Sequence, residues 1–142
     1  MKTSKNYLLP VSILLAVAAS AIFLDGVASR TVAEGCFHQV AHKGSGCAAI
    51  IRKPDGQIVL RLSDFETADS GDLQILLVSA TDAFENETVK NSEKIHIGRI
   101  SPSEGLQEFV VREGQNLTKF NSVVIWNSKH GVNFTTAPLR KY

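Results

Sequence analysis

The sequence predicts an all-β fold, a single-domain antiparallel β-sandwich of about eight short strands that follows an N-terminal signal peptide. Apolar residues alternate with other residues over short runs, which is typical of half-buried strands. Turn-forming residues separate these runs, and no stretch after residue 35 has the apolar spacing of an amphipathic helix. The alternating runs are Ile58–Leu62, Leu73–Val78, Ile95–Ile97, Phe109–Val111, Val123–Trp126 and Val132–Phe134.

Residues 1–29 have the organisation of a secretory signal peptide. Lys2 and Lys5 precede an apolar run over residues 7–24, and Val27-Ala28-Ser29 offers the small residues of a cleavage site. The alternative is an uncleaved anchor, because the run is just short of the about 20 residues that span a bilayer. We therefore expect an extracytoplasmic protein, periplasmic or secreted, which meets a membrane only if the anchor is retained.

Residues 30–142 are long enough for one compact domain, and they contain no internal repeat or linker. Removing Lys2 and Lys5 from the 15 basic residues, and Asp25 from the 14 acidic ones, leaves 13 of each with the signs interspersed. A nucleic-acid-binding surface needs a basic patch, so no nucleic-acid partner is expected.

The first two strands of the domain carry its two cysteines, Cys36 and Cys47, on either side of a turn predicted at His42–Gly46. If the connection is centred near residues 41–42, the two cysteines face each other and a cross-strand disulfide is possible. An even cysteine count in an exported chain indicates a disulfide, which would stabilise the fold by about 3 kcal/mol. The alternative is a reversible dithiol couple, because strained disulfides between adjacent strands can be labile.

The next strands are separated by a tight turn at Lys53-Pro54-Asp55-Gly56. Proline presets φ at the first central position, and Gly56 takes a positive φ. The segment Ala80–Asn91 has the weakest strand pattern, so it is predicted to be a loop or one short helical turn. Further turns are predicted at Asp69–Asp72 and Ser128–Gly131.

No constellation of catalytic or metal-ligating residues identifies a reaction, which favours a protein that is not an enzyme. Cys36, His38 and His42 form a loose set of soft ligands, but their spacing fits no zinc site, and no metal is predicted. No serine lies in a Gly-x-Ser-x-Gly elbow. No cofactor is predicted. A Cys-x-x-Cys-His haem-attachment motif is absent, whereas a bis-histidine haem is left open.

A series of landmarks runs in a fixed order along residues 35–139. They are Gly35-Cys36-Phe37, His42, Gly44-Ser45-Gly46, Pro54-Asp55-Gly56, Leu60-Arg61-Leu62, Gly71-Asp72-Leu73, Ile97-Gly98, Ser122 to Trp126 and Ala137-Pro138-Leu139. In this order and spacing they resemble the DM-thirteen domain, a family labelled "electron transfer DM". The resemblance implies an all-β fold and a role in electron transfer through a nearly invariant cysteine, as a free thiol or as a cofactor ligand.

The sequence departs from this family at two places. The resemblance puts the family cysteine at Asn127, directly after Trp126, and an amide cannot form a thiolate or exchange a disulfide. The Gly-Pro-Asp-Leu turn of the family reads Ser70-Gly71-Asp72-Leu73, without the proline. The family-motif positions are thus His42, Asp72, Trp126 and Asn127, whereas Cys36 and Cys47 lie where the family is not expected to have cysteines.

These observations leave two functional hypotheses. The favoured one is a non-catalytic binding or structural module that recognises another exported or cell-envelope protein. The alternative is a redox accessory that uses a Cys36–Cys47 dithiol couple.

Overall fold

The computed structural model describes residues 28–142 of the chain. The predicted signal peptide or anchor lies outside the described residues, apart from Ala28 and Ser29, and stays a prediction. Within the described range, no helix is both long enough and apolar enough to cross a membrane.

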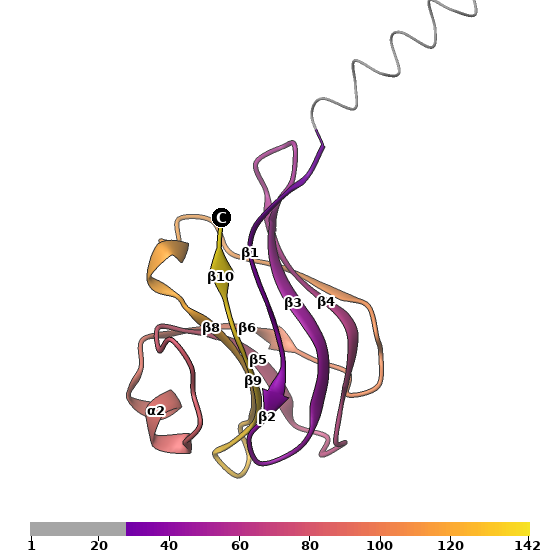
Figure 1. The fold of residues 1–142 in the computed structure, drawn as a ribbon, viewed down its shortest axis with the longest axis vertical. Coiled ribbons are helices and arrows are strands. Elements are labelled where there is room, and N and C mark those ends of the chain that lie inside the picture. The colour runs from indigo at the N-terminus through magenta and orange to yellow at the C-terminus, as the bar shows by residue number, and fades with distance from the viewer. Residues whose placement is uncertain (1–27) are drawn as a thin grey trace, which may run out of the picture.

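Two antiparallel five-stranded sheets pack against each other and form the body of the molecule (Figure 1). The first sheet has the strand order β10 (Arg140–Lys141), β1 (Arg30–Cys36), β3 (Gly44–Arg52), β4 (Ile58–Thr67) and β7 (Gln107–Val110). The second sheet has the order β2 (His38–Gln39), β9 (Val132–Pro138), β8 (Ser122–Asn127), β5 (Leu73–Val78) and β6 (Lys94–Arg99). The prediction of an all-β sandwich is confirmed.

The connection between β1 and β3 differs from the predicted turn at His42–Gly46. β3 already begins at Gly44, where it pairs with Thr67 of β4. The preceding residues leave the first sheet, because the two-residue strand β2 pairs with β9 of the second sheet. The first and second sheets are therefore linked within a few residues of Cys36.

A β-bulge in β1 changes the register at the other end of this strand pair. From Cys36 to Ala33 each residue of β1 faces its partner in one register, with Cys36 opposite Cys47. The register then shifts between Thr31 and Ala33, so Arg30 faces Arg52. An extra residue in one strand has this effect.

The turn between β3 and β4 follows the prediction. Gly56 has a φ of 88°, and its N–H donates to the carbonyl oxygen of Lys53 at 2.9 Å. β4 extends beyond the predicted Leu62 to Thr67 and contains Asp64 at a φ of 51°. This positive φ turns the strand so that Phe65 is directed into the core, where it is 1% exposed.

The main core lies between the inner faces of the two sheets. Its larger fully buried members are Ile50, Leu60, Leu62, Phe65, Ile75, Leu77, Val123 and Ile125. A smaller cluster lies on the opposite face of the second sheet, beneath the helix α2 (Asn86–Asn91), and contains Leu76, Val78, Ala83, Val89 and Val124. The helix confirms the loop or short helical turn predicted for this segment. A three-residue 3-10 helix, η3 (Leu117–Lys119), lies on the connection from β7 to β8.

The C-terminal strands cross from one sheet to the other. β9 is an interior strand of the second sheet, and β10 follows it at the edge of the first sheet. At the crossing, Pro138 passes so close to β1 that a Cβ atom on Gly35 would overlap its carbonyl oxygen. Glycine at this position therefore lets the backbones meet.

Candidate functional site

Cys36 and Cys47 form a disulfide that joins β1 to β3, as predicted. Their Cα atoms are 3.8 Å apart, and the two residues are direct cross-strand partners. Backbone pairing continues on both sides of the bond, because Gly35 faces Ala48 and the Phe37 N–H donates to the Gly46 carbonyl oxygen at 3.0 Å. Cys36 is exposed and Cys47 is half-buried. The bond thus lies on the solvent face of the first sheet.

Asn127 ends β8 with a buried side chain, 2% exposed, whose amide nitrogen and oxygen each form a hydrogen bond. Its Nδ2 donates to Ser70 Oγ at 2.9 Å, and its Oδ1 accepts from the His130 N–H at 3.0 Å. Its carbonyl oxygen accepts from the Gly131 N–H at 2.9 Å. The amide therefore holds together two turns, the one before β5 and the one between β8 and β9.

Asp72 and Trp126 lie beside Asn127, but with different surroundings. The Asp72 carbonyl oxygen accepts from the Ser128 N–H at 3.3 Å. Its carboxylate is 3.9 Å from the Arg99 guanidinium. This ion pair is exposed, so it contributes little to the stability of the fold. Trp126 is half-buried and packs against the small cluster beneath α2.

His42 lies apart from these residues at the β9 side of the second sheet. Its ring packs on that of Phe134, with centroids 4.1 Å apart, and its N–H donates to the Phe134 carbonyl oxygen. Among the described residues, no hydrogen bond or ring contact joins His42 to Trp126 or Asn127. Of the four family-motif positions, three are neighbours and His42 is not among them.

A second group of residues surrounds His38, which the sequence offered only as a loose metal ligand. Its Nε2 lies 2.7 Å from Asp82 Oδ1, and its Nδ1 lies 3.0 Å from the Gln39 carbonyl oxygen. The ring stacks on Phe84, with centroids 4.8 Å apart and an interplanar angle of 24°. Phe84 itself is 66% exposed. The result is a large apolar ring held at the surface in a fixed orientation.

Two acceptors face the two nitrogens of the His38 ring. Only the imidazolium can donate from both nitrogens, so this arrangement favours the charged form. Burial lowers the pKa of His38, but the hydrogen bonds to Asp82 and to the Gln39 carbonyl oxygen, together with the charge of Asp82, outweigh burial and raise the pKa. Among the described residues, no group of three metal-ligating side chains forms around His38 or elsewhere.

Buried polar residues of β8 and β9 fix the loop that carries Phe84. Asn133 Nδ2 and Thr136 Oγ1 both donate to the Ala83 carbonyl oxygen at 3.0 Å. The Asn133 N–H donates to Asn86 Oδ1 at 2.8 Å, and Ser122 Oγ donates to the Ala80 carbonyl oxygen at 2.8 Å. Since these donors lie in a rigid sheet, the loop is anchored on both sides of Phe84.

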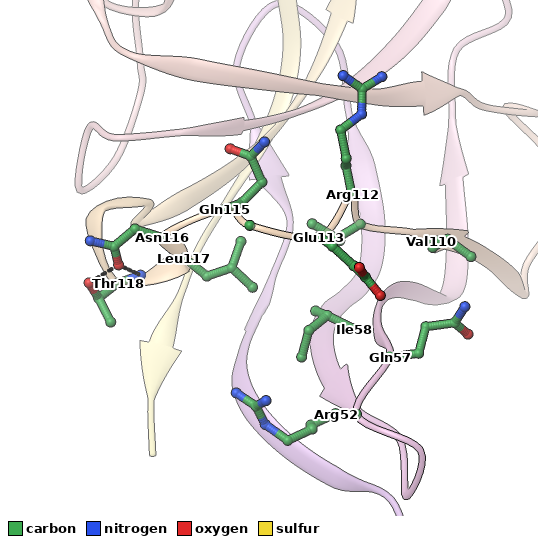
Figure 2. A pocket seen from close by; sticks show the side chains of 13 residues that line it. Arg52, Gln57, Ile58, Val110, Arg112, Glu113, Gln115, Asn116, Leu117 and Thr118 are labelled. Carbon is green, nitrogen blue, oxygen red and sulfur yellow. Dashed lines mark hydrogen bonds between the residues drawn. The ribbon is translucent and has the colours of Figure 1, made fainter.

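A hollow of about 540 Å³ opens at one end of the sandwich, where the chain passes from β7 to β8. Figure 2 shows Ile58 and Leu117 at its centre and Arg52 at its border, while the Arg112 guanidinium points away from Arg52. An adjoining hollow of about 240 Å³ shares Arg52 and Leu117 with it. Arg30 lines the adjoining hollow.

Sequence reasoning missed the residues around His38 and the arginines of the open end. Asp82 is separated from His38 by 44 positions, and no short motif connects them. The signal that could have indicated the anchored loop is the polar content of β9, because Asn133, Thr135 and Thr136 interrupt a strand that is buried on both faces. Such residues are usually hydrogen-bonded to something that covers them.

A family model described as Electron transfer DM13 matches residues 36–139. The match covers nearly all of the sandwich, and it confirms the resemblance seen in the order of landmarks. No curated protein and no solved structure matches the chain.

Proposed function

Because the chain belongs to the electron transfer DM13 family, we propose that it is an exported, non-catalytic binding or structural module that keeps the fold of this family. Its partner is another exported or cell-envelope protein. The observation that carries the proposal is the exposed ring of Phe84 on an anchored loop. Exposed aromatic side chains in fixed positions are favourable anchors for a protein partner, because little side-chain entropy is lost on binding.

Asn127 supports the non-catalytic part of the proposal. At the position where the resemblance puts the family cysteine, this chain has an amide whose nitrogen and oxygen are both engaged. A buried amide of this kind stabilises turns and offers no thiolate to a cofactor or a disulfide. Asn127 therefore fits a protein that retains the family fold and acts by binding a partner at its surface.

Site-specific photo-crosslinking tests the binding proposal. A photoreactive phenylalanine analogue replaces Phe84 in the full chain, and the organism that makes the protein is irradiated. Tyr142 is the matched control, because it is also 66% exposed but directly follows β10 at the edge of the first sheet. We expect one discrete crosslinked protein from position 84 and none from position 142. The absence of a product at position 84, or equal products at both positions, would contradict the proposal.

The exposure of Cys36 favours a second candidate function, the redox accessory that exchanges electrons through the Cys36–Cys47 couple. The reduction potential of this couple separates the two candidates. A value below about −300 mV identifies a structural disulfide. A value between about −230 and −120 mV, the range of exchange proteins, would replace the binding proposal by the redox one.

A further inference from the structure

We propose that the open end of the sandwich binds a small amphiphile with an oxyanion head group, whose head contacts Arg30 and Arg52 and whose apolar part lies on Ile58 and Leu117. This inference goes beyond the proposed function and does not depend on it, because Phe84 lies on a different surface. The two hollows that share Arg52 form the site.

Arg30 and Arg52 lie side by side on the inner face of the first sheet. In β3 the residues Ala48 and Ile50 face the core, and Arg52 continues the same alternation at the end of the strand. Because Arg30 is the cross-strand partner of Arg52, it lies on the same side of the sheet. Two guanidinium groups therefore extend from the inner face of the first sheet, at the point where the core opens to solvent.

The charged side chains around this arginine pair are mostly positive. Like charges that are directly opposite on paired strands repel each other. Neither Arg30 nor Arg52 forms an ion pair with any of the described residues. The Arg112 guanidinium points away from Arg52, and the other cationic side chains that line the two hollows are Arg30, Arg52 and Lys141. Only one acidic side chain, Glu113, lines them. The side chains around the arginine pair thus carry a net positive charge.

Lys141 adds to this positive potential. Its Nζ donates to the Thr118 carbonyl oxygen and, at 2.8 Å, to Asn121 Oδ1. Both acceptors are neutral, so these bonds position the ammonium group without neutralising it. They also hold η3, which carries Leu117, against the end of the first sheet.

The floor of the site is apolar, which selects an amphiphile over a simple inorganic anion. Ile58 and Leu117 are only partly buried and pack against the core below them. A hollow of about 540 Å³ is within the usual range for small-ligand sites. Arginine binds carboxylate and phosphate oxygens in a planar, two-bonded geometry, so both head groups fit the pair.

Calorimetric titration of the full chain with octanoate and with octyl phosphate tests the inference and separates the two head groups. Acetate and octanol are the reference probes, since each lacks one half of the proposed ligand. We expect saturable binding of at least one of the two amphiphiles, at least about tenfold tighter than acetate or octanol. No saturable binding of either amphiphile would overturn the proposal, and acetate binding as tightly as both amphiphiles would identify an adventitious ion only.

The variants Arg52→Gln and Arg112→Gln form a matched pair, because each removes one positive charge from the same end of the molecule. Figure 2 shows that the Arg112 guanidinium is directed away from Arg52. We expect Arg52→Gln to weaken amphiphile binding by about tenfold, as for the loss of a charge-assisted hydrogen bond. Arg112→Gln should leave the affinity within about twofold, because its guanidinium is directed away from the head group and acts on it only through screening solvent. Equal losses of affinity in both variants would show that the amphiphile is bound by non-specific electrostatic attraction, which would contradict the proposal.

Discussion

The outer faces of the two sheets differ in what covers them. On the first sheet, the outer face carries the disulfide and a group of ion pairs in which Glu108 contacts Lys53 and Arg61, each at 3.5 Å. This face is largely exposed, although Ile51 and Val59 on it are buried. On the second sheet, the outer face is covered by the loop and helix between β5 and β6, so β5, β8 and β9 are buried along most of their length. A sandwich strand can therefore lose its alternation of buried and exposed residues without any change in the sheet itself, when a third layer lies over it.

The third layer also explains where the polar residues are placed. On the covered sheet, polar side chains such as Asn133 and Thr136 are fully buried and hold the loop by hydrogen bonds. On the open sheet, polar side chains face solvent, and a covalent bond joins β1 to β3. The two sheets thus use different interactions for their outer faces.

The largest expected loss of stability comes from truncating a buried side chain on the covered face of the second sheet. Leu76→Ala removes a side chain that is 1% exposed in the small cluster beneath α2, which should lower the free energy of unfolding by about 2–5 kcal/mol. Leu106→Ala is the matched control on the open side, where the side chain is 68% exposed and the expected change is within about 0.5 kcal/mol. Urea unfolding of both variants gives the comparison. Similar midpoints for the two would show that the helix does not bury the second sheet.

The next effect concerns the covalent bond of the open face. The double variant Cys36→Ala/Cys47→Ala should lower the free energy of unfolding by about 3 kcal/mol, because the unfolded chain gains the freedom that the closed loop had denied it. Urea unfolding measures this change. The wild-type chain in reductant is the control and should unfold at the same midpoint as the variant. An unchanged midpoint in the variant would mean that backbone pairing alone holds β1 to β3.

The smallest effect is a pH dependence of the anchored loop. The folded pKa of His38 is raised, so its contribution to stability is fully present below the unfolded pKa of about 6.5 and is lost as the pH rises through the folded value. The stability difference between the wild type and His38→Gln should therefore shrink from acidic to alkaline pH. Thermal unfolding across this range measures it, and His130→Gln, at an exposed turn, is the control. A difference that grows with pH would contradict the ion pair with Asp82.

The sequence predicts the sandwich well because alternation and turn residues are local signals. Gly56 in the turn before β4 and the cross-strand cysteines are examples in which nearby residues determine the geometry. The cover on the second sheet is not a local property, since it depends on contacts between residues about 50 positions apart, such as Asn133 and Ala83. For the same reason the sequence did not reveal that Asn127 is buried, because its partner Ser70 is 57 positions away.

At the open end, one inserted residue changes the cross-strand partner of Arg30, so the partner cannot be predicted by extending the register of the cysteines. Continuing the register that pairs Cys36 with Cys47 would put Arg30 opposite Lys53. The bulge around Val32 shifts the partner to Arg52, which belongs to the inner face. Bulges have only a weak sequence signature, so the arginine pair follows from the structure and not from the pattern.

The strand order also has a consequence for the way the chain acquires its fold. The strands β1, β3, β4 and β7 of the first sheet are available once Val110 has been synthesised, whereas the second sheet lacks an interior strand until residues 132–138 emerge. During vectorial synthesis, β2 has no neighbour until that moment, because β9 is its pairing partner. The sandwich therefore closes only after β9 has been synthesised, because the second sheet is incomplete without it.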